Sequence, residues 1–196
     1  MIATHATMLH MVKKWKKLEK IANVKSVRRM AIDKQVFLRP DGKRVSWFIR
    51  SGEGKVVVCA LTKEKKIVLI QQFRHGIDSI DIGLASGGFS KGETALACAK
   101  RELKEETGYS SHDWIALGKH AISAGNSAGW QYSFLALECV EGVQELEADE
   151  YIDVLVVSKE ELQGYMAKNK IHDSGPLLAL HLAKEEVLKR FSYLLF

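Results

Sequence analysis

Short runs rich in Val, Ile and Phe alternate with turn-forming residues through much of the chain, a pattern typical of β-strands. Pro40-Asp41-Gly42 and Gly52-Glu53-Gly54 separate neighbouring runs and are strong turn signals. The predicted strands are 27–33, 35–39, 46–50, 56–61, 67–73, 132–140 and 151–157. They lie on both sides of a central helical segment, and further helical signals come late in the chain, which fits an α/β sandwich.

Helical spacing occurs near both ends of the chain. Trp15, Leu18 and Ile21 recur at intervals of three, which predicts a packed amphipathic helix at 15–21. Its apolar face is too short to favour a helix that lies on a membrane. Ser158 begins a capping box, and a last helix is expected after Pro176.

The central helical segment, 94–107, concentrates acidic residues. Glu102, Glu105 and Glu106 project to one side, because residues three and four apart share a helix face. We expect the apolar residues to pack on a core and to leave the acids outward. These apolar residues are Ala95, Leu96, Ala97, Ala99 and Leu103.

Glycines surround this helix. Gly87 and Gly88 permit a tight turn and close backbone approach, and Gly92 permits a further unusual turn. Gly108 stands where the C-terminal end of the helix is expected. The segment is therefore predicted to run from loop to helix to loop.

The acidic face has two explanations. Like charges at this spacing repel by about a few tenths of a kcal/mol, a cost that a bound cation offsets. Carboxylate oxygens suit Mg²⁺ or Mn²⁺. The same charges also fit a solvated helix face balanced by Lys100, Arg101 and Lys104. The charge pattern alone leaves both open.

The segment from Gly87 to Tyr109 resembles the signature of the Nudix hydrolases at every fixed position, and a match of this length is selective. The matching positions are Gly87, Glu93, Arg101, Glu102, Leu103, Glu105, Glu106, Gly108 and Tyr109. The resemblance implies that water attacks a diphosphate bond with help from Mg²⁺ or Mn²⁺.

The same resemblance implies a role for each charged residue in the box. Glu102 and Glu106 would be metal ligands, and Glu105 would be a further ligand or a base. Arg101 and Glu93 would hold the loop to the helix, since a guanidinium can bind a carboxylate bidentately. Gly87 and Gly108 would be structural.

Residues outside the box resemble the ADP-ribose and nucleoside-diphosphate-sugar pyrophosphatase branch. Gln72-Phe73-Arg74 matches a segment that ends a core strand in that branch, which implies that Arg74 contacts the substrate diphosphate together with Gly88. An ordinary arginine at a strand end is the alternative. Ser86 would offer its backbone carbonyl to a metal.

The acidic run 147–150 supplies one more candidate. Glu150 aligns best with a further metal ligand or catalytic carboxylate, while Glu147 and Asp149 are weaker candidates. A solvated acidic turn is the alternative. Gly83 and Gly129 depart from the branch, because its members often carry acids at those positions, so the number of metals and the sugar preference stay open.

The resemblance implies a Nudix α/β/α sandwich with a mixed sheet. We expect residues 1–54 to form an N-terminal helix and a small β subdomain that takes part in dimerisation and in the substrate site. Residues 55–196 would form the Nudix hydrolase domain. The expected assembly is a homodimer.

Composition supports a folded protein and narrows the partners. The chain has 196 residues, with 46% hydrophobic and 27% charged residues. No run reaches the roughly twenty apolar residues that span a bilayer. The apolar start precedes a lysine-rich stretch, the reverse of a secretory signal, so a cytoplasmic protein without a membrane partner is expected. The net charge of +5 can steer a phosphate-bearing small molecule, so no nucleic-acid partner is expected.

The three cysteines are widely separated in the sequence. Cys59, Cys98 and Cys139 lie among apolar neighbours, which predicts small buried side chains and not a disulfide or zinc framework.

The alternative functions are hydrolysis of another nucleoside diphosphate derivative or of a nucleoside triphosphate, and ligand sensing without catalysis. The intact acids and the end of the chain at Phe196 count against the sensor.

Overall fold

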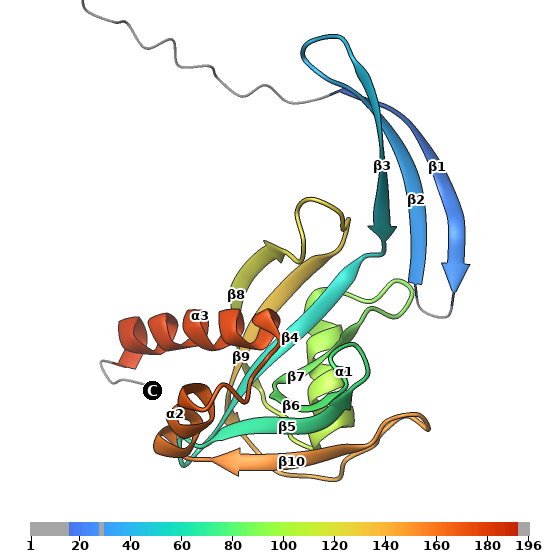
Figure 1. The fold of residues 1–196 in the computed structure, drawn as a ribbon. Coiled ribbons are helices and arrows are strands. Elements are labelled where there is room, and N and C mark those ends of the chain that lie inside the picture. The colour runs from blue at the N-terminus through green and yellow to red at the C-terminus, as the bar shows by residue number, and fades with distance from the viewer. Residues whose placement is uncertain (1–15, 28–29, 192–196) are drawn as a thin grey trace, which may run out of the picture. The chain divides into compact units, whose positions relative to one another are not determined.

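The computed structural model describes residues 16–27 and 30–191, and the chain divides into two compact units. The first unit extends to Gly52 and includes residues 125–127; the second comprises 53–124 and 128–196. A three-stranded sheet belongs to the first unit and a seven-stranded sheet to the second (Figure 1).

The sheet of the first unit is an antiparallel meander. β1 (Lys16–Val27) pairs with β2 (Met30–Leu38), which pairs with β3 (Arg44–Ser51). The predicted strands 27–33 and 35–39 are largely joined in β2, and Val27 ends β1 instead. Gly42, with φ of 82°, makes the turn between β2 and β3 and donates its N–H to the Arg39 carbonyl.

The helix predicted at 15–21 is wrong from Lys16 onward. Lys16 to Ile21 belong to β1, where they pair with residues 34–38 of β2. A helix of seven residues is marginal in water, because nucleation costs more than so few hydrogen bonds return. Pairing with a neighbouring strand satisfies the same backbone groups. Trp15 lies outside the described residues.

The second unit contains a mixed sheet in the order β10-β5-β4-β9-β8, with β6 paired to β5 and β7 paired to β4. β4 and β9 are parallel, and the other pairs are antiparallel. The strands are β4 (Gly54–Thr62), β5 (Ile67–Arg74), β6 (Ser79–Gly83), β7 (Ala85–Gly88), β8 (Asp113–Ala121), β9 (Trp130–Cys139) and β10 (Ile152–Val157).

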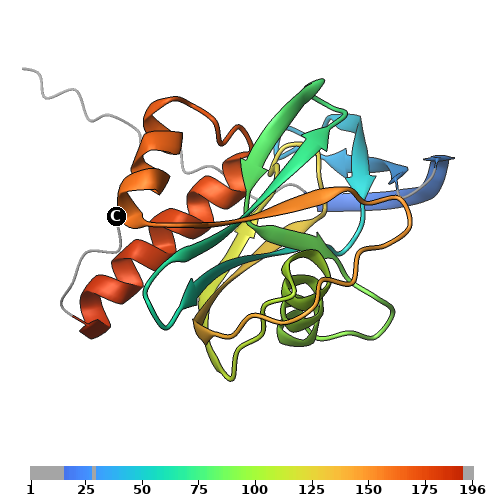
Figure 2. The ribbon, with the colours of Figure 1, turned by 90° about the horizontal axis from the view of Figure 1, so that it is seen from below.

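Helices cover both faces of this sheet (Figure 2). Alternate β4 residues Val56 and Val58 join the core beneath α1 (Ala95–Thr107). Val57 and Cys59 point to the opposite core, which α2 (Lys159–Ala167) and α3 (Ser174–Phe191) cover. A strand buried on both faces becomes a nearly continuous apolar run, as β4 does. The predicted α/β/α sandwich is confirmed.

The later helices follow their sequence signals. Ser158 caps α2 in a capping box with Glu161, as predicted. α3 begins at Ser174, so Pro176 lies inside its first turn, where its missing N–H is not needed. Across 16–27 and 30–191, none of the helices has the length and apolar character that crossing a bilayer demands.

Three strands of the second unit were not predicted. β6, β7 and β8 are short or rich in glycine and polar residues, so they lack a strong strand pattern. Each pairs with a strand that was predicted, respectively β5, β4 and β9. Their conformation therefore depends on tertiary pairing more than on local preference.

Candidate active site

Helix α1 has well-defined ends. The Thr94 hydroxyl accepts the Ala97 N–H at 3.2 Å, which satisfies one of the free donors of the first turn. At the other end Gly108 adopts a left-handed conformation with φ of 77° and donates to the Lys104 carbonyl. The predicted helix stop at Gly108 is confirmed.

The expectation that the acids face outward is wrong for two of them. Glu102 and Glu106 are only 7% and 3% exposed, and they lie on the same helix face as buried Cys98 and Leu103. Glu102 falls four residues after Cys98, and Glu106 four after Glu102, so helical geometry carries both carboxylates inward. Leu96 is exposed instead.

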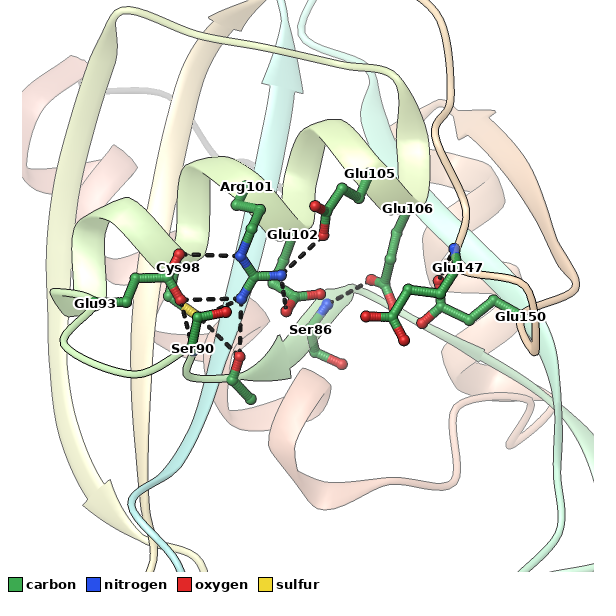
Figure 3. A network of polar contacts seen from close by, with 11 residues as sticks. Ser86, Ser90, Glu93, Cys98, Arg101, Glu102, Glu105, Glu106, Glu147 and Glu150 are labelled. Carbon is green, nitrogen blue, oxygen red and sulfur yellow. Dashed lines mark hydrogen bonds and ion pairs between the residues drawn. The ribbon is translucent and has the colours of Figure 1, made fainter. Parts of the chain in front are cut away.

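Strand β7 lies against this acidic face (Figure 3). A Cβ atom on Gly87 would lie 2.1 Å from the Glu102 carboxyl carbon, so only glycine leaves room for that carboxylate. One residue earlier, the Ser86 N–H donates to Glu106 Oε2 at 2.7 Å. The backbone of β7 and two helical carboxylates are thus brought together at one place.

Arg101 fastens the preceding loop to the helix. Its Nε and Nη2 bind the two Glu93 carboxylate oxygens at 3.0 Å each, and its Nη2 also donates to the Gly88 carbonyl at 2.9 Å. The Ser90 N–H donates to Glu93. Hydrogen bonding to Arg101 lowers the pKa of Glu93 to about 2. This geometry is the one expected of Arg101 and Glu93.

The same guanidinium also contacts the helix acids. Arg101 Nη1 lies 2.7 Å from Glu102 Oε1 and 2.8 Å from Glu105 Oε2 (Figure 3). Glu105 is therefore engaged in an ion pair one helical turn from its partner. Glu102 is held by one oxygen.

Burial dominates the electrostatics of the two inner acids. It raises the pKa of Glu106 to about 8; the hydrogen bond from Ser86 opposes this, and the charges of Glu102 and Glu150 add to it. Burial likewise raises the pKa of Glu102, against the hydrogen bond and charge of Arg101. Desolvated carboxylates close to one another form an environment that favours a bound cation.

The segment 144–150, here called the acidic loop, is attached to the C-terminal end of α1, where the Glu145 N–H donates to the Glu105 carbonyl at 3.0 Å. In Figure 3 the Glu150 side chain points toward Glu106, and the charge of Glu150 raises the pKa of both Glu102 and Glu106. Glu150 accepts the Glu147 N–H at 3.0 Å within a tight turn. Asp149 lines a separate groove beside Phe73 and Tyr151.

Three further residues singled out from the sequence lie outside the Glu102 and Glu106 pair. Arg74 is the last residue of β5, and its charge lowers the pKa of Glu106, which brings it into the same electrostatic environment. Gly83 faces α3, since its Cβ would meet Pro176 Cγ at 3.5 Å. A Cβ on Gly129 would lie 3.2 Å from the Gly54 Cα, so close strand packing explains that glycine.

Sequence reasoning missed Gln144. Its Nε2 donates to the carbonyls of Glu106 and Ile152, at 2.6 and 3.2 Å. An isolated glutamine in an acidic stretch carries no spacing signal, and only the fold shows what it contacts.

The donor set fits a hard divalent cation. Glu102 and Glu106 offer buried carboxylate oxygens, which Mg²⁺ and Mn²⁺ prefer, and the Gly87 backbone leaves open space for one of them. Within 16–27 and 30–191, no three Asp, Glu, His or Cys side chains converge as a ready-made ligand cluster. Mg²⁺ commonly uses only one or two carboxylates and completes its shell with water and phosphate oxygens.

Comparisons with known proteins agree with this geometry. The model of the NUDIX domain matches residues 52–180. An ADP-ribose pyrophosphatase of Bacillus subtilis is 31% identical over 76% of this chain and 83% of its own. A methanol dehydrogenase activator of Bacillus methanolicus is 30% identical over the same shares.

A solved structure of an ADP compounds hydrolase shares the fold. It superposes with a TM-score of 0.81 over 93% of this chain and 99% of its own, at 18% identity. The family match spans most of the chain and contains the acidic helix, its loop and its paired glycines. The chain therefore belongs to the Nudix family.

Proposed function

We propose that this protein hydrolyses the diphosphate bond of ADP-ribose or a related nucleoside diphosphate sugar, giving a nucleoside monophosphate and a sugar phosphate. The observation that carries the proposal is the buried Glu102 and Glu106 pair beside β7, near the charges of Arg74 and Glu150. The name of the Bacillus subtilis relative supports the substrate class.

Mg²⁺ or Mn²⁺ is the cofactor in this proposal. Glu102 and Glu106 would hold it with the Ser86 carbonyl, and Glu150 would supply a further carboxylate. When bound, such a cation neutralises phosphate charge and lowers the pKa of a bound water. Arg74 and the Gly88 backbone would bind and orient the diphosphate.

Two carboxylates compete for the role of general base. Glu105 is paired with Arg101 at 2.8 Å, so abstraction of a proton from water would have to disturb that ion pair. Glu150 lies near Glu102 and Glu106 and accepts only a backbone N–H among its described hydrogen bonds. We therefore favour Glu150 over Glu105 as the base.

The proposal includes a domain division and an assembly. Residues 1–54 would serve dimerisation and part of the substrate site, and residues 55–196 would form the hydrolase domain of a homodimer. Trp47 and Phe48 are consecutive in β3 and therefore point to opposite faces of its sheet, where they are 49% and 62% exposed; an exposed aromatic side chain on either face suits contact with another subunit. The three free thiols fit a reducing cytoplasm. No nucleic acid or membrane is proposed as a partner.

A substrate panel with Mg²⁺ or Mn²⁺ tests the function. It should contain ADP-ribose, GDP-mannose, UDP-glucose, NADH, diadenosine polyphosphates and nucleoside triphosphates, with phosphate-bearing products measured. ADP-ribose or another nucleotide sugar should have the highest kcat/KM. Preference for another diphosphate derivative or a triphosphate would favour the alternative hydrolase, and no release from any compound would favour a ligand sensor.

Substitution of the inner acids tests the chemistry. Glu102→Gln and Glu106→Gln should each lower metal-dependent hydrolysis at least about a hundredfold while the fold is retained, because each removes a cation ligand. The Gln163→Ala variant, on the exposed side of α2, serves as the control. Wild-type turnover in both glutamate variants would contradict the proposed site.

A further inference from the structure

We infer that Gln144 is a positioning residue that holds the acidic loop against α1 and thereby places Glu150 at the reaction site. Because Glu150 belongs to that site, this inference rests on the proposed function.

The Gln144 side chain joins both sides of the acidic loop. Its Nε2 donates to the Glu106 carbonyl at 2.6 Å and to the Ile152 carbonyl at 3.2 Å. Glu106 belongs to α1, while Ile152 begins β10 just after Glu150. One amide group therefore uses both hydrogens to connect the helix that carries the inner acids with the strand that follows the loop.

The backbone of the loop makes a second attachment to the same helix end. The Glu145 N–H donates to the Glu105 carbonyl at 3.0 Å. The last turn of a helix leaves its carbonyls without intrahelical partners, so Gln144 and Glu145 satisfy two of these acceptors. The attachment therefore uses carbonyl groups at the end of α1 that need hydrogen-bond donors from outside the helix.

Two glycines permit the close approach. A Cβ on Gly108 would lie 2.8 Å from the Gly142 carbonyl oxygen, and a Cβ on Gly142 would lie 2.9 Å from the Gly108 carbonyl oxygen. Neither side chain could be enlarged without moving the backbones apart. The path of the chain into the acidic loop is therefore tightly constrained just before Gln144.

Glu150 depends on this attachment for its place. It follows Gln144 by six residues and precedes Ile152 by two, so both of its chain connections lead to groups that the Gln144 amide holds. The exposed Lys104–Glu145 ion pair also links helix and loop, but both side chains are 54% exposed and such pairs contribute little.

The first test is Gln144→Met, which keeps side-chain length and removes both hydrogen bonds. We expect kcat for the best substrate to fall about tenfold or more, as for residues that orient ligands or catalytic groups, with little change in KM. Lys104→Ala is the matched control, because it removes the exposed link and should leave kcat unchanged. An unchanged kcat in a folded Gln144→Met protein would overturn the inference.

A double-mutant cycle separates positioning from a general structural effect. If Gln144 acts through Glu150, adding Gln144→Met to Glu150→Gln should lower kcat no further than Glu150→Gln alone. Losses that multiply in the double variant would show that the two residues act independently, and the inference would fall.

Amide hydrogen exchange gives a readout that needs no activity. Residues 145–150 should exchange faster in Gln144→Met than in the wild type, while the interior of α1 should be unchanged. If the wild type hydrolyses no diphosphate, the proposed function fails, and the exchange rates still decide whether Gln144 holds the loop. Equal rates in the acidic loop would overturn the inference.

Discussion

At the scale of single residues, the site depends on placing carboxylates where water is scarce. Glu102 and Glu106 lose hydration on the inner face of α1. Hydrogen bonds from Ser86 and Arg101 replace only part of the lost interactions with water. Such an arrangement is costly for the folded protein alone. A bound cation would offset that cost. The residues that destabilise the metal-free fold are therefore the ones proposed as metal ligands.

Gly87→Ala tests the space beside Glu102. The added Cβ would lie 2.1 Å from the carboxyl carbon, so the carboxylate must move, although a side-chain end moves at small cost in folding free energy. We expect activity to fall about tenfold or more and the urea midpoint to change little. Gly164→Ala, whose Cβ would have no atom within 4 Å, should retain full activity. Equal turnover in the two variants would contradict the role of Gly87.

Glu106→Gln tests the cost of the buried charge. Without metal at about pH 9, where Glu106 is ionised because its pKa is about 8, the amide keeps an acceptor for Ser86 but removes repulsion with Glu102 and Glu150, so the melting temperature should hold or rise. When Mg²⁺ is at a hundred times its Kd, the free energy of unfolding of the wild-type protein should rise by about 2.7 kcal/mol, and that of the variant should rise much less. Thermal unfolding with EDTA and with Mg²⁺ measures both. If Mg²⁺ stabilised the variant as much as the wild type, Glu106 would be excluded as a ligand.

At the scale of elements, the site is a junction of β7, α1 and the loop between them. The Glu93–Arg101 pair bridges eight residues of sequence and anchors the loop at Gly88 and Ser90. The Arg101 and Glu93 side chains are 27% and 12% exposed, so solvent screens the pair in part. The pair should stabilise the protein as well as order the loop.

The pH dependence of Glu93→Gln tests this pair. Arg101 lowers the pKa of Glu93 from 4.5 to about 2. The stabilisation of the folded protein by this pair is therefore fully present above pH 4.5 and is lost as the pH falls through about 2. The variant should be less stable by roughly 1 kcal/mol at neutral pH, and the difference should vanish in acid. Urea unfolding across this range measures it. Glu145→Gln, at an exposed pair, should differ far less from the wild type; a Glu93→Gln difference independent of pH would refute the prediction.

At the scale of the whole molecule, two cores share one sheet in the second unit. Cys59 lies in the core beneath α2 and α3, whereas Cys98 and Cys139 lie in the core beneath α1. All three are free thiols. The prediction that these cysteines are small buried side chains is confirmed, and burial raises the pKa of each to about 12.

Alkylation rates test whether the two cores open together. In the native protein at neutral pH, all three thiols should react with iodoacetamide far more slowly than in guanidinium chloride, because they are buried and protonated. If unfolding of the shared sheet exposes them, their rates should be equal. Mass spectrometry of each cysteine peptide measures this. Much faster reaction of one cysteine would show that its core opens separately.

Much of the second unit was predictable from local patterns. The apolar runs of β4 and β5, the capping box at Ser158 and the glycine stop at Gly108 are local signals, and each appears in the structure where it was expected. The acidic helix was predictable for the same reason. Side-chain period and capping preferences act over a few residues, so the sequence alone determines them.

Tertiary structure decided the rest. Lys16 to Ile21 join a strand because β2 lies beside them, and β7 forms from Ala85 to Gly88 because β4 offers it a partner. The inward position of Glu102 and Glu106, and the contacts of Gln144, depend on groups up to tens of residues away. The chain alone therefore determined which residues could carry the chemistry, whereas packing between distant segments decided which of them are desolvated and brought together.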